Sequence, residues 1–118
     1  MPERKPSALI DDILTCIHHI REYIHNISFD EFSNNFMIIE ACLYNIRIIG
    51  EAVSKLPEDI KMNNPQIPWV LIKGMRNRLI HDYIGTDLQL VWKVIKDELP
   101  VFEKDLEKIH GVLIERNR

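Results

Sequence analysis

The chain has 118 residues, of which 46% are hydrophobic and 28% are charged, as in an ordinary globular domain. This length fits one domain with one hydrophobic core, so residues 1–118 are predicted to form a single unit. No apolar run approaches the ~20 residues that a membrane-spanning helix needs. The charged start MPERKPS has no apolar stretch behind it and does not resemble a signal peptide. We therefore expect a cytoplasmic protein.

The net charge also limits the class of protein. A formal net charge of −3 and an isoelectric point of about 5.9 argue against a protein that coats nucleic acid by bulk electrostatics. A small basic site within an acidic chain is still compatible with these values. Cys16 and Cys42 lie in apolar helical patterns and are predicted to be buried, reduced thiols. No Cys/His spacing indicates zinc, and we expect neither a metal nor a cofactor.

The first half of the chain is predicted to be helical, because glycine is scarce and no alternating strand pattern is present. Ser7 is the expected N-cap of a first helix that continues to about Ile27, with apolar residues every three or four positions. Ser28 followed by Glu31 has the pattern of a capping box, which marks the start of a new helix after a turn.

A second long helix is predicted from about Asn35 to Lys55, and it is apolar on more than one side. Ala41, Ile48 and Ala52 lie outside its core stripe. A helix with two apolar sides typically has two packing partners, and a second copy of the chain is the simplest second partner. We therefore expect a homodimer. The core stripe consists of Ile38, Ile39, Cys42, Leu43, Ile46, Ile49 and Val53.

Pro57 ends the second helix, and the turn-rich segment 57–68 connects it to a third, with room for one helical turn. Pro68 fits the first position of the third helix, and Gly85 fits the position just after its end.

A fourth helix completes the predicted fold. Asp87 is its expected N-cap, and it covers Leu88 to about Glu115 with a bend at Pro100. The sequence thus predicts an all-α protein, a largely antiparallel four-helix bundle with a short extra helical turn.

The third helix carries an anomaly on its apolar stripe. At ~100° per residue, Arg76 and Tyr83 fall on the same stripe as Trp69, Ile72, Met75, Leu79 and Ile80. An arginine on a core-facing stripe is costly unless it is paired or opens into a cleft. Asn77 and His81 lie together on one flank, four residues apart, so the Asn77 amide can hydrogen-bond the imidazole.

These residue types suit acid–base chemistry on a phosphate. At the end of a helix, the macrodipole favours the charged form of His81, whereas the nearby arginines oppose it. His81 is therefore predicted to titrate near neutrality, as a general acid or base must. A substrate phosphate could meet Arg76, with Lys73 or Arg78 as a further positive charge.

The motif and its surroundings resemble a known family. Arg76, four residues, His81, one residue and Tyr83 match the Arg-x4-His-x-Tyr motif of the HEPN superfamily, in its HepT toxin branch. The segments IPWVLIKGMRNRLIHDYIGTDLQLVWKVIKDELP and IRIIGEAVSKL are similar to that branch as well, and the similarity extends over essentially the whole chain. The resemblance implies a small helical bundle that dimerises and cleaves RNA without a metal ion.

The resemblance also implies a role for each motif residue. Arg76 and His81 would be catalytic, and Asn77 would support them as the polar residue after the arginine. Tyr83 would be the target of a cognate minimal nucleotidyltransferase antitoxin that adds AMP to it. RNA carries its own nucleophile, the 2′-hydroxyl, so a metal is not required. Two copies would bring two histidines to one cleft, one as the base and one as the acid.

Two other interpretations remain open at this stage. The protein could be a binding module without catalysis, a helical dimer that holds a nucleotide, RNA or a partner protein. It could also be a purely structural interaction protein, in which Arg76 pairs with Glu51 or Asp12 and His81 caps helix carbonyls.

Overall fold

The computed structural model describes residues 4–80 and 87–116, and within these ranges every regular element is a helix. The predicted all-α bundle is therefore confirmed. Within α5, the side chains of Arg76, Arg78, Leu79 and Ile80 also lie outside the described part. The elements are α1 (Pro6–Tyr23), α2 (Phe29–Ser33), α3 (Phe36–Lys55), α4 (Glu58–Met62), α5 (Trp69–Ile80), α6 (Leu88–Lys93), the π-helix η1 (Val94–Glu98) and α7 (Leu99–Arg116).

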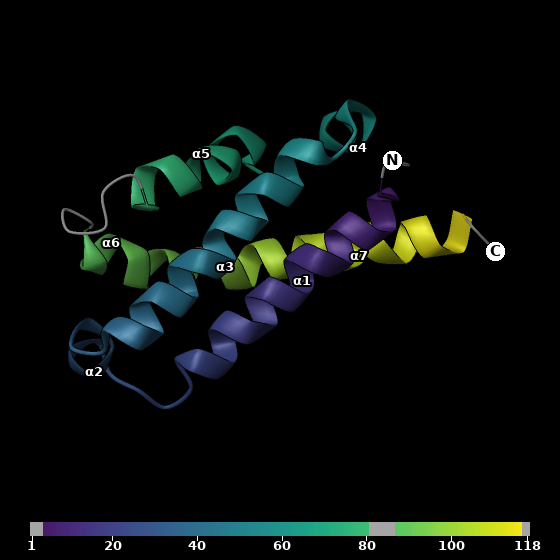
Figure 1. Cartoon of the computed structure of the whole chain (residues 1–118). Coiled ribbons are helices and arrows are strands. Elements are labelled where there is room, and N and C mark those ends of the chain that lie inside the picture. Colours follow the sequence, from purple (N-terminus) through teal and green to yellow (C-terminus); the bar gives the residue numbers. More distant parts are fainter. Residues whose placement is uncertain (1–3, 81–86, 117–118) are drawn as a thin grey trace.

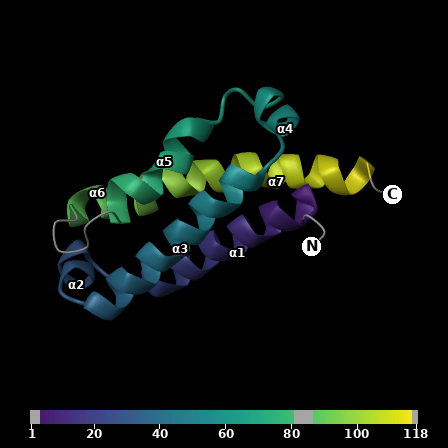
Figure 2. The same cartoon turned by 45° about the horizontal axis from the view of Figure 1, so that its top comes forward.

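The helix α3 is the centre of the bundle. It runs antiparallel to α1 on one side and to α5 on the other, as Figures 1 and 2 show. The helix α7 packs against α1, and the start of α1 lies at the same end of the molecule as the end of α7. The short helices α2 and α4 lie at opposite ends of α3, where the chain reverses direction.

The bounds of α1 differ from the prediction at both ends. The N-cap is Lys5 rather than Ser7, because Pro6 occupies the first helical turn and its missing N–H costs nothing there. The helix ends at Tyr23 rather than near Ile27, and Asn26 then adopts a φ of 59°. Asparagine tolerates this left-handed conformation better than most residues. The apolar pattern continued past the helix because Ile24, although outside α1, is still buried.

The predicted capping box is confirmed, and the next helix begins at a cap that the sequence patterns did not predict. The Ser28 hydroxyl accepts from the Glu31 N–H at 3.1 Å, and the Glu31 carboxylate accepts from the Ser28 N–H at 3.1 Å, which completes a capping box. The Asn35 side chain accepts from the Ile38 N–H at 3.2 Å and starts α3. Within α3, buried Asn45 donates to the Ala41 carbonyl at 2.9 Å, so its amide is not left unsatisfied.

The connector between α3 and α5 contains the single helical turn that the sequence allowed, as α4. The third predicted helix begins at Trp69, one residue later than expected, so Pro68 precedes it rather than opening it. The Pro68 carbonyl accepts from the Ile72 N–H at 3.0 Å. The predicted end of this helix at Gly85 lies outside the described residues.

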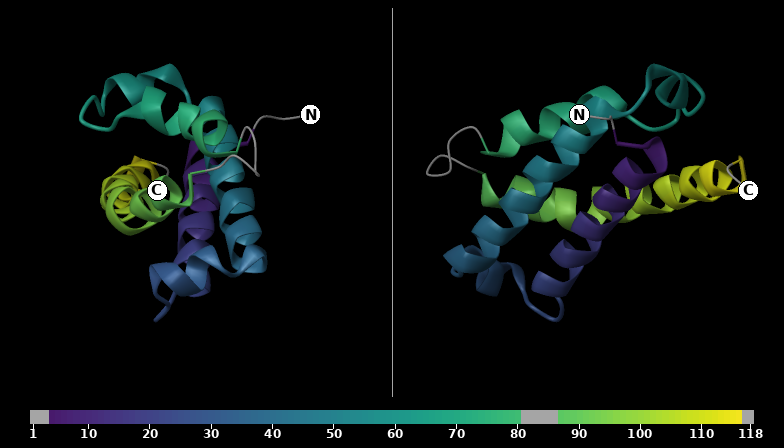
Figure 3. Two further views of the ribbon diagram at one scale, coloured as in Figure 1. Left: turned by 90° about the vertical axis from the view of Figure 1, so that its left-hand side faces the viewer. Right: turned by 45° about the vertical axis from the view of Figure 1, so that its right-hand side comes forward.

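The last predicted helix consists of α6, η1 and α7, which follow one another without a gap. Asp87 caps α6 as predicted, accepting from the Gln89 and Leu90 N–H groups at 3.1 and 3.2 Å. In the left view of Figure 3 the three segments lie along one axis. The π-helix η1 lies just before Pro100, at the point where proline cannot donate a helical hydrogen bond. The local π turn therefore lets the helix continue through the proline.

One connected core joins these helices, and its most buried side chains include Phe32, Ile46 and Leu106. Cys16 and Cys42 are buried and free, as predicted. Burial raises the pKa of the Cys42 thiol to about 12. No helix within residues 4–80 and 87–116 is long and apolar enough to cross a membrane.

Candidate functional site

The helix α5 confirms the stripe that the sequence predicted, as far as the structure describes it. Trp69, Ile72 and Met75 are buried, and they lie on one face at a spacing of three residues. The backbone of α5 extends through position 76, and the placement of the Arg76 side chain on this face stays a prediction. His81 and Tyr83 lie outside the described residues, as do the side chains of Arg76 and Arg78.

The opposite flank of α5 faces a groove shared with α3. This groove has a volume of about 340 Å³. Lys73 and Asn77 line it from α5, and both side chains are exposed. The predicted phosphate contact and the predicted supporting amide therefore lie in one groove. Its remaining lining residues are Gly50, Glu51, Ser54, Val70 and Gly74.

Small residues make this groove possible. Gly50 and Ser54 lie one turn apart on α3, and Gly74 lies on α5. A Cβ added at Gly74 would meet no atom within 4 Å. Sequence patterns alone do not mark Gly50, Ser54 and Gly74 as part of a site. The available signal was the placement of two of the four glycines on facing helices, which can be recognised only once the helices are paired.

The two carboxylates that the sequence offered as partners for Arg76 both have other arginine partners. Asp12 accepts two hydrogen bonds from Arg4, each 2.8 Å long. Glu51 lies 3.4 Å from the Arg47 guanidinium, one turn earlier on α3. The pairing of Arg76 with Asp12 or Glu51 stays a prediction, because the Arg76 side chain lies outside the described part of the structure.

A second apolar stripe lies on the outer side of α3. Met37 and Tyr44 are 67% and 59% exposed, and Ala41 and Ile48 are half-buried. The spacing of these four residues is four, three and four, which is the pattern of a helix–helix seam. The stripe leads to Glu51, which lines the groove described above. The outer face of α3 and the groove are therefore continuous.

Comparison with known proteins assigns the chain to a family. A family model described as "Ribonuclease HepT-like" matches residues 13–109. A protein of Methanocaldococcus jannaschii named "Putative RNase MJ1216" is 41% identical over 109 residues, which are 92% of this chain and 90% of that protein. "Probable ribonuclease HepT" of Thermococcus cleftensis is 34% identical over 111 residues, which are 91% of this chain and 97% of that protein. No solved structure matches the chain.

Proposed function

Since the chain belongs to the HepT-like ribonuclease family of the HEPN superfamily, we propose that it is a metal-independent endoribonuclease and the toxin of a toxin–antitoxin pair. The observation that carries the proposal is the family match over residues 13–109, together with the complete Arg-x4-His-x-Tyr motif at Arg76, His81 and Tyr83. The ribonuclease names of its relatives support the same activity.

The proposed reaction uses the 2′-hydroxyl of RNA as its nucleophile. His81 takes the proton of this hydroxyl, a contribution of roughly 10²–10⁴-fold in rate. Arg76 stabilises the negative charge that develops on the phosphorus oxygens. The O–P bond to the 5′-oxygen breaks as the bond to the 2′-oxygen forms, and an acid protonates the leaving oxygen. The products are a 2′,3′-cyclic phosphate and a free 5′-hydroxyl.

The groove between α3 and α5 supports RNA binding beside this motif. Lys73 supplies a positive charge to a backbone phosphate, and the Asn77 amide offers both a donor and an acceptor. The Arg47 guanidinium lies within 3.4 Å of Glu51 and offsets the negative charge that Glu51 brings to the groove. The floor of glycine and serine allows a strand to approach the helix backbones closely.

A second copy of the chain is proposed to cover the outer stripe of α3. The stripe formed by Met37, Ala41, Tyr44 and Ile48 supplies an apolar seam, and a twofold axis across it places one α3 against the other. Because the seam leads to Glu51 in the groove, the two grooves would lie close together. Each histidine could then serve one step of the proton transfer, one as the base and one as the acid.

Replacing His81 tests the catalytic assignment. The His81→Ala variant should lose roughly 10²–10⁴-fold in RNA cleavage rate, with unchanged circular dichroism, and should no longer arrest growth when expressed. The matched control is His18→Ala, since His18 is an exposed histidine on α1 that lies 3.6 Å from Glu22. A His81→Ala enzyme that cleaves at the rate of the control would show that the assignment is wrong.

Tyr83 is proposed as the site at which a cognate nucleotidyltransferase antitoxin adds AMP. A bulky anionic adduct there would compete with RNA for the positive charges of the motif. After co-expression with the partner enzyme and ATP, intact-mass measurement should show the mass of one AMP on each chain. The Tyr83→Phe variant should remain unmodified; an AMP adduct on that variant would assign the modification to another residue.

A charged substitution on the outer stripe of α3 tests whether this stripe is the dimer interface. The Tyr44→Arg variant should sediment as a monomer and lose RNA cleavage, because a buried unpaired charge would stand at the seam. Val112→Arg is the control, since Val112 is exposed to a similar degree on α7. A Tyr44→Arg protein that is still dimeric would place the interface elsewhere.

A further inference from the structure

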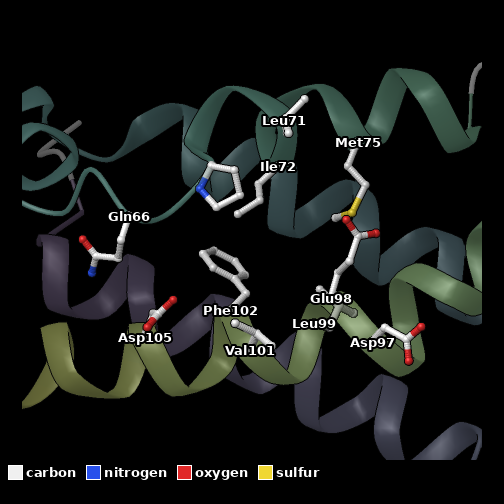
Figure 4. A pocket seen from close by; sticks show the side chains of 11 residues that line it. Gln66, Leu71, Ile72, Met75, Asp97, Glu98, Leu99, Val101, Phe102 and Asp105 are labelled. Atoms are coloured by element: carbon white, nitrogen blue, oxygen red, sulfur yellow. The ribbon is translucent and has the colours of Figure 1, made fainter.

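A second cleft lies between α5 and α7, on the side of α5 away from the groove already described. It has a volume of about 260 Å³. In Figure 4 the Phe102 ring points from α7 toward Ile72 on α5, and Met75 points down into the space beside it. The rings of Trp69 and Phe102 meet edge to face with centroids 6.0 Å apart, which ties one end of α5 to α7. The cleft is therefore a built feature between two anchored helices.

The floor of the cleft is apolar, and one exposed aliphatic side chain from each helix lies beside it. Ile72, Met75, Leu99 and Phe102 line it and are buried. At the edges, Leu71 on α5 is 62% exposed and Val101 on α7 is 61% exposed. Exposed aliphatic side chains on both sides of an apolar hollow are typical of a surface that a partner covers.

The rim of the cleft is acidic. Asp97, Glu98 and Asp105 line it, and among the described residues no lysine, arginine or histidine does so. Figure 4 shows Glu98 reaching up toward Met75, with Asp97 and Asp105 at the two ends of the hollow. The nearby Lys96 lies over the Trp92 ring, 5.5 Å from its centroid, and is not among the lining residues.

This charge pattern selects the kind of occupant. Three carboxylates around the opening repel a nucleic-acid strand, whose phosphates carry the same sign. They also oppose a second copy packed through the same face, because a twofold axis would bring each acidic rim against its equivalent. The complementary surface is apolar at its centre and basic at its edges.

We propose that the cleft between α5 and α7 is a docking site for a partner protein, which inserts large apolar side chains of an amphipathic helix flanked by lysine or arginine. An apolar cavity of roughly 150 Å³ already holds a benzene ring, so a hollow of about 260 Å³ takes one or two leucine or phenylalanine side chains. The flanking basic residues meet Asp97, Glu98 and Asp105. This is a helix-in-groove contact with electrostatic selection of the partner.

The direct test uses a synthetic amphipathic helical peptide of leucine and lysine and the ¹³C-labelled methyl group of Met75. The peptide should shift the Met75 methyl resonance in the full-length protein, and added salt should weaken binding. A matched peptide with glutamate in place of lysine should leave the resonance in place. Equal binding of the two peptides, or binding that leaves Met75 unaffected, would overturn the proposal, as would no binding of the lysine peptide.

Two triple variants distinguish the effect of the carboxylates on the rim from the effect of the net charge of the protein. The triple variant Asp97→Asn, Glu98→Gln and Asp105→Asn should bind the lysine peptide about tenfold more weakly. The control, Asp30→Asn, Glu40→Gln and Asp59→Asn, removes the same charge from exposed positions elsewhere and should bind as the wild type does. Equal weakening in both triple variants would reduce the effect to net charge and refute a specific site.

Two further outcomes would assign the cleft to another occupant. A single-stranded RNA oligonucleotide that shifts the Met75 resonance would make the cleft part of an RNA path. A change of oligomeric state in the Val101→Ser variant would make it an interface between copies of the chain. The proposal predicts neither result, and circular dichroism of each variant verifies that the fold is intact.

Discussion

The helices α3 and α5 lie side by side, but they differ in how much of their surface the bundle covers. Of the 20 residues of α3, nine are buried, and its inner side packs against α1 and α5. The helix α5 buries Trp69, Ile72 and Met75 but leaves Val70 83% exposed. It has an open hollow on each side, of about 340 Å³ toward α3 and about 260 Å³ toward α7.

This difference in coverage suggests different roles: α3 stabilises the bundle, whereas α5 carries the candidate site. The burial of α3 supplies stability, since each buried aliphatic side chain contributes about 1.5–3 kcal/mol. The described side chains of α5 include three that are buried, and the sides that face the two hollows are accessible to ligands. Arg76, the first residue of the motif, belongs to the helix α5, and His81 and Tyr83 follow outside the described residues.

The largest expected contrast is between a core residue of α3 and a surface residue of α5. Ile46 is fully buried, so Ile46→Ala should lower the free energy of unfolding by about 3 kcal/mol. Val70→Ala removes a side chain that is mostly in solvent and should change stability by less than about 0.5 kcal/mol. Urea denaturation of both variants measures the contrast. Similar losses in the two would show that α5 is as much a part of the core as α3.

The buried Cys42 thiol of α3 should make the stability of the protein depend on pH. Burial raises its pKa from an ordinary value of 9.0 to about 12. Above pH 9 the unfolded thiol loses its proton while the folded one keeps it, so stability falls as pH rises between about 9 and 12. The loss is at most ~1.4 kcal/mol per pH unit.

A comparison with Cys42→Ala isolates this effect from other groups that titrate in the same range. The variant should lose stability less steeply with pH than the wild type when urea denaturation is repeated at pH 8, 9 and 10. Parallel pH profiles for the two proteins would mean that Cys42 ionises as readily in the folded state as in the unfolded one.

A small gain in stability is expected from an alanine at Gly74. Alanine is favoured over glycine inside a helix by about 0.5–1 kcal/mol, and an added Cβ meets no atom within 4 Å. Gly111→Ala on α7 should stabilise the protein similarly, because its surroundings are equally open. If RNA lies in the groove between α3 and α5, only Gly74→Ala should slow RNA cleavage. Equal cleavage rates in the two variants would place RNA outside that groove.

Local signals in the sequence predicted most of the scaffold. The predicted caps at Ser28 and Asp87 are short-range patterns, and the structure contains both. The prediction of Ser7 as the N-cap of α1 was wrong, because the helix already begins at Pro6 and Ser7 lies within its first turn. The end of α1 was placed too late because Ile24 packs into the core from outside the helix.

The candidate site was predictable in part. Periodicity placed Lys73 and Asn77 off the buried stripe of α5, and the structure confirms that both are exposed. Their shared groove depends on Gly50 and Ser54 of α3, which lie about twenty residues earlier in the chain. Pairing of this kind is set by tertiary packing, so the spacing within one helix cannot reveal it. The catalytic roles of Arg76 and His81 remain predictions.

The most direct test of the account is an assay of RNA cleavage by the purified wild-type protein in EDTA, with analysis of the product ends. We expect that cleavage survives chelation, that the products carry 2′,3′-cyclic phosphate and 5′-hydroxyl ends, and that His81→Ala forms neither. Binding of RNA without any product would instead favour a non-catalytic module, an interpretation that the net charge of −3 allows. Cleavage that stops in EDTA, or that His81→Ala performs at the wild-type rate, would contradict the proposed mechanism.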